Sequence, residues 1–218
     1  MEKISISLDP SVDNDLESYL EFLNTQPDIS IHLDVMDGDF VPRKSVSAQQ
    51  YAHIVQNSRH KIDVHLMISN PHLKINPYIA KALWGTIRSL SFHPEGMTES
   101  EILALMKKIR LMGLRAGIVI DLPVAIDALP SSILDDADMF TVMSVKAGAS
   151  GQKFQHRALD KVKRLKKLYP NTPIIIDGGI NPDNATAAKD AGTTTLVVGN
   201  AVYSAGNRTT TIKALQKV

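Results

Sequence analysis

The sequence of 218 residues contains no cysteine. This absence excludes disulfide bonds, zinc sites built on thiolates and catalysis by a thiol nucleophile. Aromatic residues are also scarce, at 5%, which disfavours a surface that stacks nucleic-acid bases. Lys and Arg number 24 against 23 Asp and Glu, so the charge balance gives no reason to expect binding to nucleic acid or to an anionic membrane.

Long hydrophobic runs are missing as well. No segment approaches the roughly 20 consecutive apolar residues that span a bilayer. The first residues, MEKISISLDPS, lack the apolar region of a signal peptide. At 44% hydrophobic residues the chain is nevertheless apolar enough to build a core. We expect a soluble cytoplasmic protein that folds as one domain over residues 1–218.

Short apolar runs recur along the whole chain, and segments with helical spacing lie between them. The runs that predict strands are 4–8, 29–35, 62–68, 87–93, 115–121, 139–145, 173–179 and 194–200. The spacing predicts helices over 99–113, 156–170 and 181–192. Alternation of strands and helices through a whole chain is typical of α/β folds with a parallel sheet.

Eight repeats predict a closed (β/α)8 barrel. The alternative is an open doubly wound sheet, which often carries a glycine-rich turn after its first strand. Here LDPSVDND follows the first predicted strand, without a glycine. The glycines cluster instead after the last three strands, where barrels commonly bind phosphate. The sequence therefore favours the barrel.

Polar residues stand where several predicted strands end, which is where barrels carry their chemistry. His32 and Asp34 are two apart on one strand, so their side chains leave the same face. His65 and Asp177 end two other strands. Two imidazoles and two carboxylates form a suitable ligand set for zinc, iron, cobalt or manganese, whereas burying them without partners would be costly. We expect His93, near another strand end, to be an ordinary hydrogen-bonded histidine.

Further side chains fall on the same inward positions. Ser7 ends the first predicted strand, and Met36, Met67 and Met143 lie near the ends of three others. Methionine is a common core filler. These three methionines either fill the core or form an apolar wall behind a reacting carbon.

Glycines give a second signal. The loop SVKAGASGQKF (144–154) follows the sixth predicted strand, and Gly178-Gly179 and Gly199-Asn200 end the next two. Backbone N–H groups in such loops can bind an anion. Each glycine alone is best explained as a turn, but together they predict a phosphate pocket.

The segments HLDVMDGDFVP, DVHLMISNP, SFHPE, VMSVKAGASGQKF, DGGINPDN and VVGNAVY occur in an order that resembles ribulose-phosphate 3-epimerases over essentially the whole chain. That family consists of (β/α)8 barrels that interconvert D-ribulose 5-phosphate and D-xylulose 5-phosphate with a divalent metal. The resemblance implies His32, Asp34, His65 and Asp177 as metal ligands. It also implies proton transfer at C3 by Asp34 and Asp177 through a metal-stabilised enediolate. Further residues are expected to orient the second ring nitrogens of the two histidines.

The resemblance also implies a homo-oligomer, a dimer or a hexamer, and a loop at 146–152 that closes over the substrate. The substrate contacts that it implies are Ser7, His65, Gly148, Ala149, Ser150, Gly151, Gly178, Gly179, Gly199 and Asn200.

Three departures from the family pattern leave the substrate open. The loop at 146–151 is Lys-Ala-Gly-Ala-Ser-Gly instead of Asn-Pro-Gly-Phe-Gly-Gly, Asn200 replaces a serine, and Asp-Leu-Pro at 121–123 replaces Asn-Pro. The implied metal and acid/base positions are unchanged. The alternatives to a pentulose phosphate are another ketose phosphate, such as allulose 6-phosphate, or a barrel that binds a sugar phosphate without turning it over.

Overall fold

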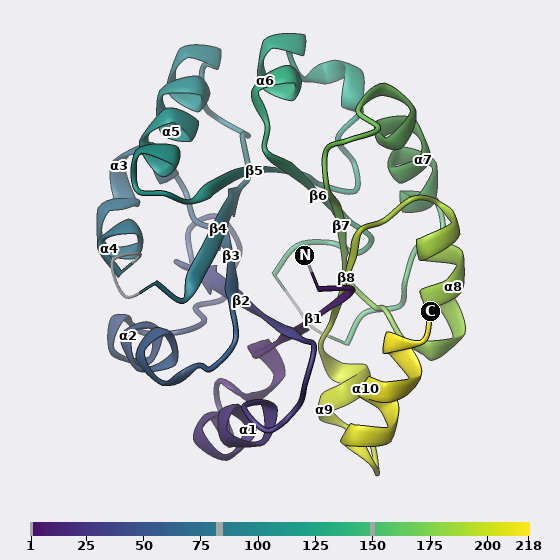
Figure 1. The fold of residues 1–218 in the computed structure, drawn as a ribbon. Helices are drawn as coiled ribbons and strands as arrows, with labels where there is room; N and C mark the ends of the chain where they lie inside the picture. Colours follow the sequence, from purple (N-terminus) through teal and green to yellow (C-terminus); the bar gives the residue numbers. More distant parts are fainter. Residues whose placement is uncertain (1, 82–84, 149–150) are drawn as a thin grey trace.

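The eight predicted strands form a closed barrel. The computed structural model describes residues 2–81, 85–148 and 151–218. Each strand pairs in parallel with its neighbours in chain order, and β8 pairs with β1 to close the ring (Figure 1). The strands are β1 (Ile4–Ser7), β2 (Ser30–Met36), β3 (Ile62–Met67), β4 (Ile87–Phe92), β5 (Arg115–Ile120), β6 (Met139–Met143), β7 (Ile174–Asp177) and β8 (Thr195–Val198). The closed ring confirms the barrel and excludes the open doubly wound sheet.

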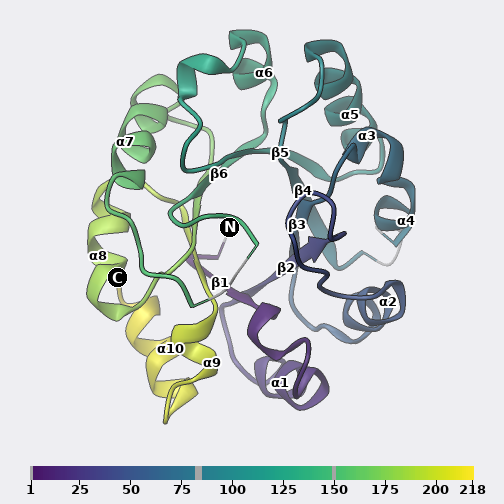
Figure 2. The same cartoon turned by 180° about the vertical axis from the view of Figure 1, so that it is seen from behind.

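Helices surround the barrel on the outside (Figures 1 and 2). Those of the first half are α1 (Leu16–Leu23), α2 (Ala48–Asn57), α3 (Pro71–Lys74), α4 (Asn76–Ile79) and α5 (Glu99–Leu111). The second half contains α6 (Ser131–Asp136), α7 (Ala158–Leu168), α8 (Pro182–Asp190), α9 (Asn200–Tyr203) and α10 (Arg208–Gln216). The three predicted helices correspond to α5, α7 and α8. None of the helices in the described ranges has the length and apolarity needed to cross a bilayer.

Local sequence sets the helix boundaries. Thr98 and Asn181 accept backbone N–H groups at the starts of α5 and α8, and each takes part in a capping box. Beyond the C-terminal ends of these helices lie Gly113 and Gly192, both with positive φ. A glycine reverses the chain there without steric cost.

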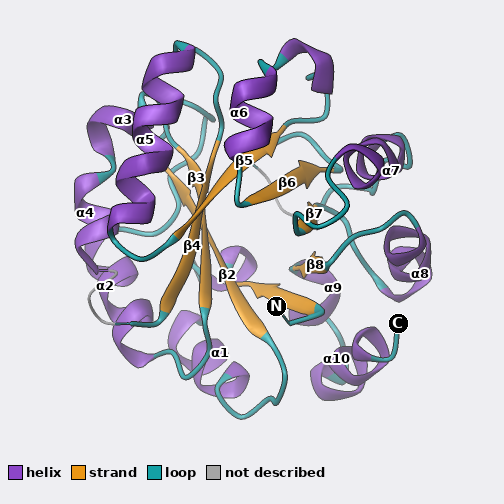
Figure 3. Cartoon of the chain, turned by 45° about the horizontal axis from the view of Figure 1, so that its top comes forward, coloured by secondary structure: helices purple, strands orange, loops and turns teal. Residues whose placement is uncertain are grey.

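The strands lie inside the ring of helices (Figure 3). The face of each strand toward the helices is apolar, whereas the face toward the barrel interior is more polar. On β3, Ile62, Val64 and Leu66 belong to the main core between barrel and helices. The residues that alternate with them, Asp63 and His65, point inward. The alternation of side chains along each strand therefore brings polar side chains into the barrel interior.

Two small apolar clusters fill the barrel interior. One consists of Met139, Ile175 and Val197, from β6, β7 and β8. At the carboxyl ends lies a cluster of Met36, Val41, Met67, Val119, Met143, Val145 and Ala147. The three methionines singled out in the sequence thus gather at the end of the barrel where such folds carry their active sites.

Candidate active site

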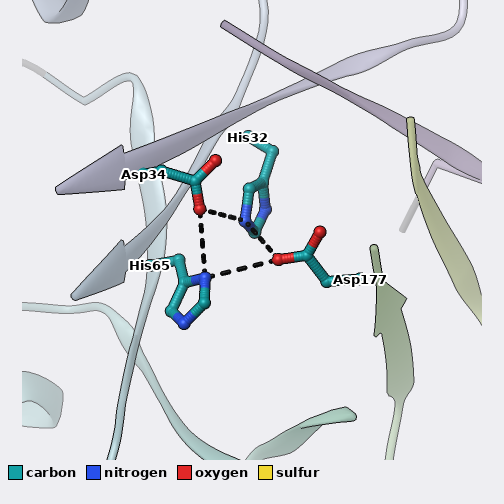
Figure 4. Close-up of side chains that lie close together, drawn as sticks. All are labelled: His32, Asp34, His65 and Asp177. Carbon is teal, nitrogen blue, oxygen red and sulfur yellow. Dashed lines mark hydrogen bonds and ion pairs between the residues drawn. The ribbon is translucent and has the colours of Figure 1, made fainter. Parts of the chain in front are cut away.

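Four titratable side chains meet at the carboxyl ends of three strands. β2 supplies His32 and Asp34, β3 supplies His65 in register with Asp34, and β7 supplies Asp177. Figure 4 shows all four pointing toward a common centre. His32 Nε2 lies 3.3 Å from Asp34 Oδ1 and 3.4 Å from Asp177 Oδ2. His65 Nδ1 lies 3.1 Å and 3.4 Å from the same two oxygens.

The four separations between histidine nitrogens and aspartate oxygens match the spacing of neighbouring ligand atoms around one cation. In a tetrahedral zinc site with bonds of about 2.0–2.1 Å, neighbouring ligand atoms lie about 3.3–3.4 Å apart. The four ligand atoms here all lie within 4.8 Å of one another. His32 is buried, yet neither of its ring nitrogens has a hydrogen-bond partner among the described residues. His32 Nε2 has only the two carboxylates, at ion-pair distance. A cation between these groups would satisfy polar atoms that hydrogen bonds within the cluster leave unsatisfied, so the donor set suits a divalent cation.

The electrostatics of the cluster favour positive charge at its centre. Burial alone would lower the pKa of His32, but the carboxylates of Asp34 and Asp177 raise it well above its usual value. Burial would likewise raise the pKa of both carboxyls, and His32 instead holds both pKa values below the usual range. Both aspartates are therefore ionised and the site attracts a cation, whether a proton or a metal ion.

Ser7 orients the second oxygen of Asp34. Its hydroxyl donates to Asp34 Oδ2 at 3.0 Å and accepts the backbone N–H of Asp9 at 3.1 Å. The serine predicted at this strand end thus contacts a member of the cluster directly.

A cavity of about 680 Å³ opens above the cluster, within the size range of small-molecule sites. Asp34 and Asp177 line it together with Ser7 and the three methionines. His32 and His65 are 3% and 0% exposed and belong to the cluster beside the aspartates. The arrangement presents two carboxylates and an apolar surface to whatever enters.

The predicted phosphate-binding positions in the described residues line the same cavity. They are Gly148, Gly151, Gly178, Gly179, Gly199 and Asn200. Ala149 and Ser150 lie outside the described residues. The structure therefore brings the described part of the predicted pocket together, while the role of each residue stays a prediction.

Two of these glycines are required by the backbone itself. Gly178 and Gly179 have φ values of +118° and +63°. A Cβ on Gly179 would lie 2.6 Å from the backbone nitrogen of Phe154, and one on Gly178 would lie 2.4 Å from a methyl group of Val145. The loop after β6 therefore packs directly on the end of β7, which holds the two halves of the predicted pocket together.

Several polar residues of the cavity were not singled out in the sequence. Lys153 and His156 line it together with Lys146. Lys153 lies within the glycine-containing loop at 144–154 and His156 lies two residues beyond it, and that proximity is the signal that could have identified them. Asn200 turns its side-chain oxygen toward Ser204, which donates to it at 2.9 Å.

His93 also proves to be more than an ordinary histidine. It is indeed buried and hydrogen-bonded, but its partner belongs to the cluster: His93 Nε2 lies 3.0 Å from His65 Nε2. The inward parity of Ser91 and His93 on SFHPE was the available signal.

The fold and the site together define a (β/α)8 barrel with a candidate metal centre beneath a glycine-lined cavity. A family model described as the ribulose-phosphate 3 epimerase family matches residues 3–203. The chain belongs to this family, and it is an isomerase of the epimerase type.

Curated proteins named ribulose-phosphate 3-epimerase are similar in sequence to this chain over most of their lengths. A ribulose-phosphate 3-epimerase of Aquifex aeolicus is 34% identical over 80% of this chain and 78% of that protein. One of Bacillus subtilis is 32% identical over 85% of both. The cytoplasmic isoform of Oryza sativa subsp. japonica is 30% identical over 86% of this chain and 81% of that protein.

Solved structures share the fold at low sequence identity. A 3-hexulose-6-phosphate synthase from Salmonella typhimurium has a TM-score of 0.72 and 14% identity, covering 100% of this chain and 97% of the other. A tryptophan synthase α-subunit from Pyrococcus furiosus has a TM-score of 0.70 and 15% identity, covering 100% and 97%. These similarities support the barrel and nothing further.

Proposed function

We propose that the protein is a metal-dependent 3-epimerase that interconverts D-ribulose 5-phosphate and D-xylulose 5-phosphate. One observation carries the proposal. Asp34 and Asp177, from β2 and β7, converge with two histidines at a cavity of small-molecule size. The names of the relatives supply the pentulose phosphate as the first substrate to test.

Inversion at C3 suits this pair of carboxylates. The proton on C3 is acidified by the neighbouring C2 carbonyl, and inversion requires its removal from one face and its return to the other. One aspartate takes the proton while the other, protonated, delivers one to the opposite face. Turnover exchanges the protonation states of Asp34 and Asp177. The negative charge of Asp34 opposes the lowering of the Asp177 pKa by His32, so a proton on either aspartate relieves the repulsion between the two carboxylates.

His32, Asp34, His65 and Asp177 would hold the cation, for which zinc, iron, manganese and cobalt are all chemically suitable. When bound, a divalent cation supplies the positive charge that stabilises negative charge developing on the substrate oxygens during proton removal.

The rest of the cavity positions the sugar. Met36, Met67 and Met143 present an apolar surface that keeps water from the reacting carbon. Backbone N–H groups of the glycine-lined end would bind the phosphate and so hold C3 between the aspartates. Ser7 keeps Asp34 in place through the hydrogen bond between them.

A different ketose phosphate is the second candidate. The departures that motivate it, Lys146 and Asn200, both line the cavity, so the residues that differ from the family pattern lie where they could contact the substrate. A longer sugar such as allulose 6-phosphate would use the same aspartates, because the reaction at C3 is unchanged.

The resemblance also supports a homo-oligomer, a dimer or a hexamer, located in the cytoplasm. Analytical ultracentrifugation of the purified protein measures its oligomeric state. A monomer at micromolar concentration would contradict the proposed homo-oligomer.

Incubation of the metal-loaded protein with D-ribulose 5-phosphate in D2O tests the reaction, with NMR detection at C3. We expect inversion accompanied by deuterium at C3. Deuterium incorporation without efficient inversion would retain the chemistry and favour another ketose phosphate. Absence of exchange on both pentulose and hexulose phosphates, with metal bound, would overturn the proposed function.

A further inference from the structure

A third histidine, His93, contacts one of the two histidines that are candidate metal ligands. His93 follows β4 and is 1% exposed, and its ring packs against Phe40 with centroids 4.6 Å apart. Its neighbour in the cluster is His65, which is 0% exposed. Two fully buried imidazoles in contact need an explanation, because each has a polar nitrogen that burial removes from water.

The two rings meet through their ring nitrogens. His65 Nε2 and His93 Nε2 lie 3.0 Å apart, the ring planes differ by 22°, and the centroids are 5.1 Å apart. That centroid separation is close to the largest that a 3.0 Å contact between ring nitrogens permits. The contact therefore points outward along both rings, as in an N–H···N hydrogen bond, and the rings do not overlap face to face.

Such a bond requires one nitrogen to donate and the other to accept. His65 presents its other nitrogen, Nδ1, to the oxygens of Asp34 and Asp177. If Nδ1 is to bind a cation, its lone pair must be free, so the proton of neutral His65 resides on Nε2. His93 Nε2 must then accept, and the proton of His93 resides on Nδ1.

Glu95 selects this arrangement over its reverse. Its carboxylate oxygen Oε2 lies 3.6 Å from His93 Nδ1, an ion-pair distance longer than a direct hydrogen bond. A proton on His93 Nδ1 faces this negative charge favourably. In the reverse arrangement a lone pair of His93 would face Glu95, and the proton on His65 would move to Nδ1 and block the cation.

We propose that His93, supported by Glu95, is a positioning residue that fixes His65 in the tautomer presenting Nδ1 to the metal ion. The inference rests on the metal site of the proposed function and adds two residues to it. His93 contacts neither the cation nor the sugar in this scheme. It acts by setting the proton position and the ring orientation of a ligand.

Zinc affinity of the apoprotein tests this role without any sugar present. Competition with a chromogenic chelator gives the Kd of the wild type and of three variants. Removing an outer hydrogen-bond partner of a ligand typically weakens metal binding about 10- to 100-fold, and we expect this for His93→Leu. His93→Gln, whose side-chain oxygen can still accept from His65, should recover most of the loss. Glu95→Gln should weaken binding less than His93→Leu does.

A matched control is His60→Gln. His60 is also partly buried and hydrogen-bonded, to the backbone carbonyl of Leu23 at 2.9 Å, but it belongs to the other end of the barrel. The zinc affinity of the His60→Gln variant should equal that of the wild type. If His93→Leu fails to fold, Glu95→Gln decides alone, because it preserves the packing of His93.

Long-range proton–nitrogen NMR of the zinc-loaded wild type reports the tautomers directly. The expected protons are on His65 Nε2 and His93 Nδ1. Wild-type zinc affinity in folded His93→Leu or Glu95→Gln, or a proton on His93 Nε2, would overturn the inference. Failure of the wild type to bind zinc would instead contradict the metal site, and absence of C3 exchange would contradict the proposed reaction, so the three failures are distinguishable.

Discussion

The two ends of the barrel interior treat buried carboxylates in opposite ways. At the amino ends of the strands, Asp63 is 3% exposed and meets a cation supplied by the chain itself: Arg88 donates through Nε at 3.0 Å and also through Nη2. Ser89 donates to Asp63 as well, and Glu2 takes the other side of the guanidinium. The charge there is balanced within the fold, as buried ion pairs require.

At the carboxyl ends, Asp34 and Asp177 have no such partner. Among the ion pairs of the described ranges, neither aspartate meets an arginine or lysine; each meets only His32 and His65. Imidazole is neutral unless it gains a proton. The fold thus neutralises Asp63, which has a structural role, with an arginine. Within the described part of the chain, it leaves the negative charges of Asp34 and Asp177 without a permanent positive partner, at the place where the reaction is proposed.

The largest expected effect is on activity at the unbalanced end. Asp177→Asn removes one of the two proton carriers, and we expect kcat for C3 epimerisation to fall about 10³-fold, within the range typical of lost acid–base catalysis. Steady-state rates with matched metal content measure this. Asp160→Asn, an exposed carboxyl at the start of α7, is the control and should keep wild-type activity. A loss below tenfold for Asp177→Asn would contradict its role.

The balanced end should affect stability instead. Asp63→Asn leaves Arg88 without its main counter-charge, and we expect the free energy of unfolding to fall by about 2–3 kcal/mol, because an uncompensated buried charge is costly. Urea unfolding measures the change. Asp127→Asn breaks the exposed pair with Arg164 and should cost under about 1 kcal/mol. If Asp63→Asn abolished activity in the folded protein while keeping stability, the contrast between the two ends would be wrong.

Metal loading should distinguish the same two ends. A ligand that binds only the folded state at 100 times its Kd adds about 2.7 kcal/mol of stability. We expect zinc to raise the thermal midpoint of the wild type and of Asp63→Asn, and chelation to reverse it. The double variant Asp34→Asn/Asp177→Asn should show no zinc-dependent shift. A shift of wild-type size in the double variant would place the ion elsewhere.

The smallest effect concerns a carboxylate at the carboxyl end that does have partners. Asp37 accepts from Lys74 at 2.7 Å and from the backbone N–H groups of Asp39, Phe40 and Ser69. Burial would raise the pKa of Asp37, but Lys74 and these N–H groups lower it below the ordinary 3.8. A lowered carboxyl pKa contributes stability above the ordinary value and loses it as pH falls.

Asp37→Asn should therefore cost about 1–2 kcal/mol at pH 7, typical of charge-assisted hydrogen bonds. The difference from the wild type should shrink as the pH falls below about 4. Urea unfolding at a series of pH values provides the test. A difference that grows toward acid pH would show that these partners do not lower the pKa of Asp37.

Much of this organisation was predictable from the sequence. The eight apolar runs correspond to β1–β8 within two residues at each end, because buried parallel strands are short, apolar and bounded by polar turns. The cluster was predictable because His32 and Asp34 share strand parity and barrels place strand ends together. The relation of Asp34 to His65 then follows from register alone.

The pairing of Asp63 with Arg88 was not predictable. A register irregularity between β3 and β4 lies at Ile62 and Asp63, and a long arginine side chain reaches positions that strand parity does not specify. The contact between His65 and His93 depends similarly on ring orientation, which no spacing rule encodes. Sequence periodicity therefore predicts which strand end a residue occupies, whereas tertiary packing determines its partner.

We expect one divalent cation at the carboxyl ends of the strands, where neither Asp34 nor Asp177 is paired with an arginine or lysine among the described residues. Anomalous X-ray diffraction at the zinc edge, on crystals of the zinc-loaded protein, tests this expectation most directly. We expect one peak about 2.0–2.2 Å from His32 Nε2, Asp34 Oδ1, His65 Nδ1 and an oxygen of Asp177. A peak bound elsewhere, or none at this cluster in zinc-saturated crystals, would contradict it.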